Sequence, residues 1–198
     1  MRLLKPNLYL ALIHYPVLNK HGDVIASAVT NLDIHDLARA ARTYGVRAVY
    51  IVTPLTDQKR LIGQIVSHWT TGMGGVVNPD RKTALDLISV QDSLESTQTD
   101  IESREKMRAV TVVTSAREYP QCRTIEEIQS LMLEGRPWLL LFGTAWGLTP
   151  SCMIQADHIL TPIYGVSGYN HLSVRSAVSI VLDRLVGREL SKTDKNLQ

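Results

Sequence analysis

Short apolar segments alternate with amphipathic segments along this chain, and that alternation constrains its fold more than any other feature. Apolar runs of about four to eight residues bounded by turn residues are typical of buried strands, whereas apolar residues three and four apart indicate helices. Strands and helices in regular alternation predict an α/β fold, with a mostly parallel sheet and helices on both of its faces. The strands are expected over residues 8–13, 48–54, 109–114, 138–142 and 158–162.

Capping residues mark the ends of the expected helices, because the free N–H and C=O groups there need partners. The helices are expected at residues 30–45, 57–69 and 124–134, in a short stretch after Thr149, and in a long final segment to about residue 186. The signals are Thr30 or Asn31 as the first N-cap, Gly45 and Gly135 as stops, Thr124 with Glu127 as a capping box, and Pro150 after Thr149.

Two stretches of the first half lack a clear period. Residues 70–81 (TTGMGGVVNPDR) are rich in glycine, so we expect a mobile loop there, and the absence of a GK[ST] ending argues against a phosphate-binding P-loop. Residues 91–106 are polar with few large apolar side chains, which favours an exposed helix at the edge of the sheet.

The size and charge of the chain narrow its class. With 198 residues, of which 44% are hydrophobic and 20% charged, it suits a single domain spanning residues 1–198. The formal net charge of +2 is too small to attract nucleic acid through the field of the whole protein. A nucleic-acid partner would therefore have to be held by a local basic surface.

The sequence also indicates a compartment. Cys122 and Cys152 have neither CxxC spacing nor a companion histidine cluster, which argues against a disulfide framework and against a metal site. The apolar N-terminal run is broken by His14 and Pro16 and lacks a small-residue cleavage site, so it predicts a strand rather than a signal peptide. No apolar stretch approaches the ~20 residues of a membrane-spanning helix. We therefore expect a cytoplasmic protein without a membrane segment or a metal.

Three loops at the predicted strand ends are candidates for a ligand site. In a parallel sheet the carboxyl ends of the strands share one edge, where helix N-termini present free N–H groups. The loops are residues 114–120 (TSAREYP), 141–150 (LFGTAWGLTP) and 161–173 (TPIYGVSGYNHLS). Structural explanations stay open, because glycine is common in tight strand-to-helix turns and because Asn170 or Ser173 suits an N-cap.

Two helices carry candidate surfaces. The first has a basic face of His35, Arg39 and Arg42, which is either a solvated face or a grip on phosphate, and spacing alone does not decide between them. The final helix has a wide apolar arc that needs two packing surfaces, so we expect a symmetric homodimer through this helix. The arc consists of Val174, Ala177, Val178, Ile180, Val181, Leu182 and Leu185.

Together these segments resemble the SPOUT methyltransferases, and the match covers most of the chain. The first motif of that family is a polar residue followed by an arginine and then a glycine at intervals of six, which Asp33, Arg39 and Gly45 match. The second motif, an apolar strand with a Phe-Gly turn and a further Gly-Leu before a capped helix, is matched by residues 139–159. The following strand is matched by ILTPI, and the third motif by residues 171–174 (HLSV).

The resemblance implies an enzyme that transfers a methyl group from S-adenosylmethionine to RNA, either tRNA or rRNA. It is nearest to a bacterial stand-alone branch that is sometimes fused to a tRNA guanine-N1 methyltransferase. It further implies an obligate homodimer and a trefoil knot, which is an exception to the rule that chains avoid knots, with knot and cofactor site within about residues 109–187. The implied cofactor-binding residues are Thr114, Ser115, Leu141, Phe142, Gly143, Thr144, Trp146, Gly147, Pro162, Ile163, Gly165, His171, Leu172 and Ser173.

The acceptor side of the reaction involves fewer residues. Methyl transfer from a sulfonium needs orientation and a dry site more than covalent help from the protein. Arg39 is expected to orient the substrate phosphate or the acceptor base, and Asn170 or Ser173 to hydrogen-bond the acceptor. Arg175 is placed to reach RNA from the start of the last helix. Trp146 is expected either to cover the cofactor or to belong to the core, and the same holds for Phe142.

The chain departs from the ribose-methylating members of the family at two positions. It has Ala145 where many carry Glu, and Ser173 where many carry Asn. A base nitrogen is therefore at least as suitable an acceptor as a ribose 2′-hydroxyl, and a catalytically inactive knotted RNA-binding or assembly protein is the alternative. A nicotinamide-dependent oxidoreductase is disfavoured because no GxGxxG follows the first strand.

Overall fold

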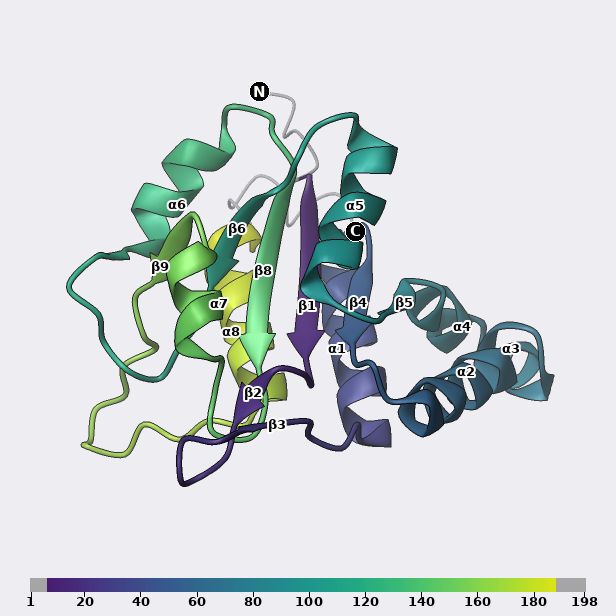
Figure 1. Cartoon of the computed structure of the whole chain (residues 1–198). Coiled ribbons are helices and arrows are strands. Elements are labelled where there is room, and N and C mark those ends of the chain that lie inside the picture. Colours follow the sequence, from purple (N-terminus) through teal and green to yellow (C-terminus); the bar gives the residue numbers. More distant parts are fainter. Residues whose placement is uncertain (1–6, 188–198) are drawn as a thin grey trace.

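The computed structural model describes residues 7–187, and its centre is a seven-stranded sheet in which every pairing is parallel (Figure 1). The strands lie in the order β5-β4-β1-β8-β6-β9-β7. Their bounds are β1 Leu8–Ile13, β4 Val49–Val52, β5 Ile88–Gln91, β6 Val110–Val113, β7 Cys122–Arg123, β8 Trp138–Gly143 and β9 His158–Leu160. A small antiparallel pair, β2 (Val17–Leu18) and β3 (Val24–Ile25), follows β1.

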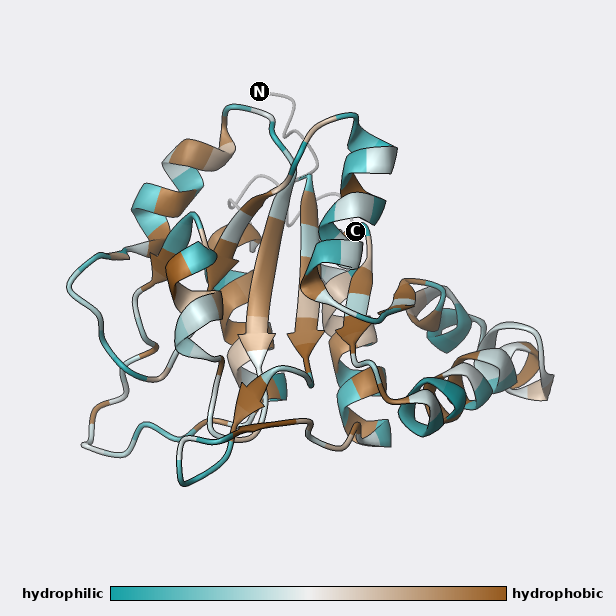
Figure 2. Cartoon of the chain, in the orientation of Figure 1, coloured by the Kyte–Doolittle hydropathy of each residue, from teal (hydrophilic) through white to brown (hydrophobic). Residues whose placement is uncertain are grey.

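Helices cover both faces of the sheet, as predicted. Alternate residues of each strand enter two separate cores, because successive side chains of a strand point to opposite faces. The first core is closed by α1 (Asn31–Thr43), α2 (Thr56–Thr70), α4 (Pro79–Leu85), α6 (Ile125–Met132) and α8 (Val174–Val186), and the second by α5 (Leu94–Glu105) and α7 (Pro150–Gln155). Figure 2 shows the central strands as almost continuously hydrophobic, which is typical of strands buried on both faces.

The capping signals in the sequence act as predicted. Thr30 is the N-cap of α1, and Thr124 with Glu127 forms the capping box of α6. Thr149 caps α7, whose first residue is Pro150. The strands and helices predicted from apolar runs are therefore confirmed, with ends displaced by a few residues at most.

The prediction of a mobile loop at residues 70–81 is wrong. This stretch ends α2, forms α3 (Met73–Val77) and begins α4, where Asn78 is the N-cap and Pro79 the first helical residue. The glycines serve close packing, since a Cβ atom on Gly74 would lie 2.8 Å from Cε3 of Trp69. The Asn-Pro pair is a helix-start signal that the glycine content concealed.

The polar stretch that follows also differs from the prediction. Residues 88–91, for which no strand was predicted, form β5 at the edge of the sheet. The predicted helix exists as α5 and covers β4 and β5, but it is not exposed throughout, because its own residues Thr97 and Ile101 are buried. Because only these two positions of α5 are buried, the sequence shows only a weak helical period of apolar residues there.

Helix α8 finds both of its packing surfaces within the chain. Val178, Val181, Leu182 and Leu185 are buried, and the helix contacts α1, α6 and β8. Its apolar arc therefore does not require a second copy of the protein, which removes the physical argument for a dimer through this helix.

Two further observations concern the environment of the chain. Within residues 7–187 no helix has both the length and the apolar character needed to cross a bilayer. Cys122 and Cys152 are free thiols, and burial raises the pKa of the Cys152 thiol to about 11, so that this group stays protonated.

Candidate functional site

The three glycine-containing loops meet at the carboxyl edge of the sheet. They follow β6, β8 and β9, and these strands are neighbours in the order β8-β6-β9 with all pairings parallel. The backbone N–H of Thr114 donates to the carbonyl of Leu141 at 3.0 Å, which ties the first loop to the second. Nδ2 of Asn170 donates to the carbonyl of Ala116 at 3.0 Å, which ties the third loop to the first. Segments far apart in the sequence thus lie side by side at this edge.

The second loop has a fixed backbone. The N–H of Trp146 donates to the carbonyl of Leu18 and the N–H of Leu18 donates to the carbonyl of Gly147, so that the loop lies along β2. Gly147 has a φ of 105° and Ala145 a φ of 51°, both in the left-handed region. For a residue with a Cβ atom this conformation is uncommon, so the surrounding hydrogen bonds must hold Ala145 in place.

Gly143 shapes this loop from inside. A Cβ atom at this position would lie 2.9 Å from the backbone nitrogen of Leu148 and 3.2 Å from the carbonyl carbon of Gly147. The space that the glycine leaves is therefore filled by the loop itself. Of the two interpretations that the sequence left open for this loop, a ligand against bare backbone and a tight strand-to-helix turn, the packing at Gly143 favours the tight turn.

A partly buried chain of polar groups connects this loop to β1, and the sequence analysis missed it. Nδ1 of His14, the first residue after β1, lies 2.9 Å from Oγ of Ser27, and that hydroxyl group bonds Oγ1 of Thr144. Thr144 in turn donates to the carbonyl of Ile13 at 2.9 Å. A histidine directly after a fully apolar strand was the available signal, because the carboxyl edge is where polar side chains meet ligands.

His14 itself is fully buried. Burial lowers the pKa of its imidazole, and the nearby Asp33 carboxylate opposes this effect only in part. Its Nε2 atom has no hydrogen-bond partner in the part of the chain that the structure describes. A neutral imidazole therefore sits behind the second loop with one nitrogen free.

The third loop is open by comparison. Among the described residues, the backbone N–H groups of residues 163–168 donate no hydrogen bond to the protein. Its side chains are largely exposed, including Tyr164 and Tyr169, and a Cβ atom on Gly165 would meet only the carbonyl of Tyr169, at 3.8 Å. Free backbone donors beside an unfilled glycine fit a ligand that is held by main-chain hydrogen bonds, as an adenosyl group would be.

The other predicted donor-site residues divide by burial. Leu141 and Phe142 are core residues at 1% exposure each, so Phe142 does not cover a ligand, whereas Trp146 is 60% exposed beside the loops. Thr114 and Ser115 are partly buried at the end of β6, and His171 and Leu172 are exposed before α8. Ser173 is the N-cap of α8, which confirms the capping role that the sequence left open.

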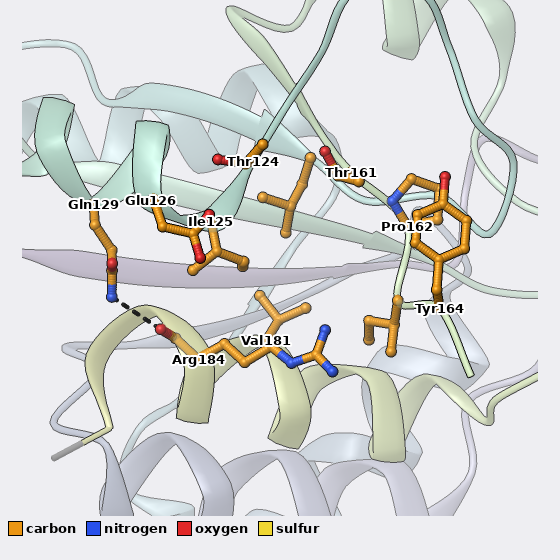
Figure 3. A pocket seen from close by; sticks show the side chains of 11 residues that line it. Thr124, Ile125, Glu126, Gln129, Thr161, Pro162, Tyr164, Val181 and Arg184 are labelled. Carbon is orange, nitrogen blue, oxygen red and sulfur yellow. Dashed lines mark hydrogen bonds between the residues drawn. The ribbon is translucent and has the colours of Figure 1, made fainter. Parts of the chain in front are cut away.

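Pro162 and Ile163 border a different hollow, of about 470 Å³, between β9, α6 and α8 (Figure 3). Its polar lining includes Thr124, Glu126 and Arg184, and no other predicted donor-site residue lines it. Ile163 and Tyr164, at the start of the third loop, belong to the lining of this hollow, whereas the contact of Asn170 with Ala116 ties the end of the same loop to the three-loop junction.

Arg39 is not brought into contact with the three loops. It is an exposed residue of α1, about 9 Å along the helix axis from Asp33 at ~1.5 Å per residue. Asp33 and Asp36, in the first turns of α1, lie 3.8 Å from the guanidinium of Arg175 at the start of α8. The first turns of α1 therefore border the third loop, and Arg39 lies farther along the same helix.

Comparison of the chain with known proteins identifies its family. The model of a family described as SAM-dependent RNA methyltransferase matches residues 7–187. The chain is 47% identical over 184 residues to the tRNA (guanine-N(1)-)-methyltransferase of Oleidesulfovibrio alaskensis, with 93% of this chain covered. It spans only 43% of that relative. It is also 38% identical to an uncharacterised protein of Aquifex aeolicus, with 94% of this chain and 91% of that protein covered.

Solved structures agree on the fold. The SpoU methyltransferase AviRb from Streptomyces viridochromogenes, in complex with AdoMet, superposes with a TM-score of 0.58 at 16% identity, covering 93% of this chain and 61% of that one. The SPOUT-type α/β fold implied by the sequence motifs is confirmed. With the family model matching nearly the whole chain, the protein belongs to the S-adenosylmethionine-dependent RNA methyltransferases.

Proposed function

We propose that this chain methylates tRNA, using the junction of the three carboxyl-edge loops as its methyl-donor site. The observation that carries the site is the meeting of loops 114–120, 141–150 and 161–173, in which the backbone donors of residues 163–168 have no acceptor among the described residues. The curated relative named for tRNA supports the substrate. Because the chain spans less than half of that relative, guanine N1 is one candidate acceptor and not an assignment.

The donor side rests on shape and hydrogen bonds. S-adenosylmethionine brings an electrophilic methyl group on sulfur, so the protein has only to orient it and to exclude water. The fixed second loop, with Thr144, Trp146 and Gly147, would form one wall. The open third loop, with Gly165, His171 and Leu172, would close over the adenosyl group, and Thr114 and Ser115 at the end of β6 would form the floor.

The acceptor side favours Asn170 over Ser173. The hydroxyl of Ser173 accepts from the N–H of Ser176 at 3.3 Å and lies 3.0 Å from Oγ of Ser176, so it is engaged at the helix start. Asn170 uses Nδ2 on Ala116, and its Oδ1 stays available to accept from a base N–H or a hydroxyl. Arg39 would orient the phosphate or the base.

The trefoil knot is part of the same proposal and is supported by the strand order. β9 lies between β6 and β7, so the 114–121 connection between these two strands crosses the carboxyl end of β9. The chain reaches β9 from α7, in the second core, and leaves it for α8, in the first core. To change faces there, the segment 161–173 has to pass the 114–121 connection, and Asn170 touches it.

The homodimer also remains a proposal. Apolar side chains gather in the segments around the carboxyl edge, including Tyr15, Leu32, Tyr169 and Leu172, each at least 40% exposed. A second copy that covers them would shield the donor site from water. Two unpaired thiols agree with a cytoplasmic location.

The decisive experiment uses two tRNA preparations, one from a strain deleted for this protein and one from its parent. The purified chain and S-adenosylmethionine carrying a labelled methyl group should label the deletion-strain tRNA and leave the parental tRNA, which is already modified, unlabelled. Nucleoside mass spectrometry then identifies the atom. No incorporation into either preparation by a chain that binds the cofactor would support the inactive RNA-binding alternative.

A further inference from the structure

Helices α1 and α4 pack together, and each of them carries two cationic side chains. We call these four residues the cationic seam; it consists of Arg39 and Arg42 on α1 and Arg81 and Lys82 on α4. Among the described residues none of the four makes a salt bridge. Sequence analysis found only the α1 half, because α4 was assigned to a loop.

Arg81 is held in a fixed position. Its guanidinium carbon lies 4.5 Å from the ring centroid of Trp69, a residue of α2, and its Nε atom is buried without a hydrogen-bond partner in the described chain. Gly74 and Gly75 pack against Trp69 and His68 too closely to admit a side chain. The glycine-rich segment therefore builds a rigid platform for Arg81.

His35 shows that the two helices direct their charge to the same place. Its ring meets Trp69 edge to face, with centroids 5.5 Å apart. Burial lowers the pKa of this imidazole, and the guanidinium groups of Arg81 and Arg39 lower it further, while Asp36 opposes them. Arg39 lies one helical turn after His35 on α1, and Arg81 contacts the same Trp69 ring as His35, so one arginine of each helix lies near this imidazole. Asp36 also lies 3.8 Å from Arg175, so its charge is shared with another cation.

Like charges that gather without carboxylate partners cost free energy unless an anion neutralises them. Arg39 and Arg42 are about 4.5 Å apart along α1 at the ~1.5 Å rise of a helix, and α4 adds two further cations, so the seam carries more positive charge than a single phosphate needs. The first turns of α1, which precede the seam, border the third loop through the contact of Asp33 and Asp36 with Arg175. An extended polyanion that must reach the carboxyl edge fits this placement.

We propose that the cationic seam binds the phosphate backbone of the substrate RNA and guides it to the three-loop junction. This inference rests on the proposed RNA methylation, and it gives Arg81, Lys82 and Trp69 a role in holding substrate. Arg is suited to it because its planar fork can pair with two phosphate oxygens at once.

The test measures binding of unmodified tRNA as a function of salt, for the full chain and for three variants. Arg81→Gln and Lys82→Gln should each weaken binding about 5- to 10-fold. Each should also reduce the magnitude of the slope of log K against log salt by about 1, because binding with one phosphate contact fewer releases fewer counterions. Arg136→Gln, which removes an exposed charge from the loop before β8, is the matched control and should leave the slope unchanged.

Lys82 is exposed, so its variant keeps the test valid even where Arg81→Gln fails to fold. Slopes equal to that of Arg136→Gln for both seam variants would overturn the proposal. So would a shift of sedimentation from dimer to monomer with RNA affinity intact, since the seam would then bind a second copy. A lowered slope in a chain that transfers no methyl group would uphold the seam while refuting the proposed function.

Discussion

The second and third carboxyl-edge loops follow strands of the same sheet but are built in different ways. The second loop is complete without a ligand: β2 pairs with it, Gly143 packs inside it, and Thr144 is bonded to Ser27 and Ile13. Within residues 7–187, the third loop leaves the N–H groups of residues 163–168 without protein partners and exposes most of its side chains. The second loop is thus closed by contacts within the protein, whereas the third leaves main-chain donors open to a ligand.

This difference predicts which property a mutation in each loop should change, stability or ligand affinity. Changes in the second loop should reduce the free energy of unfolding, because they break contacts within the protein. Changes in the third loop should reduce ligand affinity at constant stability, because few internal contacts are lost.

Gly143→Val should have the largest effect on stability. Its side chain would meet the backbone of Leu148 and Gly147, and such overpacking costs about 1–3 kcal/mol, with the upper end expected here because the clash is with backbone. Urea denaturation should show this loss. A folded Gly143→Val protein of wild-type stability with no cofactor affinity would mean that the glycine faces the ligand instead.

Gly165→Val should show the opposite behaviour. A Cβ atom there meets only the carbonyl of Tyr169, at 3.8 Å, so the unfolding free energy should stay within about 0.5 kcal/mol of wild type. Affinity for S-adenosylmethionine, measured by calorimetry, should fall at least about 10-fold, which is ~1.4 kcal/mol. Unchanged affinity would remove Gly165 from the site. Gly63→Val, on exposed α2 with nothing within 4 Å, is the control for the substitution itself and should leave affinity unchanged.

Arg39→Ala should spare both loops and impair the reaction. Arg39 is exposed and makes no salt bridge in the described chain, so stability and cofactor affinity should hold. Single-turnover methyl transfer with saturating RNA should fall about 10-fold, or ~1.4 kcal/mol of transition-state stabilisation. Arg42→Ala should lower the rate less in this assay. A larger loss for Arg42→Ala would mean that Arg42, and not Arg39, is the arginine that serves the substrate.

Thr144→Val should have the smallest of these effects. It deletes a hydroxyl that donates to Ile13 and bonds Ser27, which costs about 1 kcal/mol of stability by denaturant unfolding. Thr99→Val on α5, where the lost bond is exposed to water, should cost less. Equal losses of unfolding free energy in the two variants would show that the chain of polar groups from His14 to Thr144 does not stabilise the second loop.

The sequence predicted the five inner strands β4, β1, β8, β6 and β9 because their signals are local, and it missed the edge strands β5 and β7. Apolar runs and caps such as Thr30 and Thr124 act within a few residues, and the structure keeps them. The α3–α4 segment was mispredicted because the role of Gly74 depends on Trp69, which only the folded chain brings against it.

The site was predictable only to the level of loops. Strand adjacency brings loops 114–120, 141–150 and 161–173 together, and motif spacing marked them in advance. The hydrogen bonds from His14 through Ser27 to Thr144 include one step of 117 residues, between Ser27 and Thr144, and left no periodic signal. Likewise, the packing of Gly143 against Leu148 depends on the path of the loop and not on residue type.

Hydrogen exchange with and without S-adenosylmethionine tests the central claim most directly, because it reports each loop separately. We expect the amides of residues 163–168 to gain at least about 10-fold protection when the cofactor binds, and those of residues 144–147 to change little. Protection confined to α6 and α8, around the 470 Å³ hollow, or none in the third loop of a protein that binds the cofactor by calorimetry, would contradict the account.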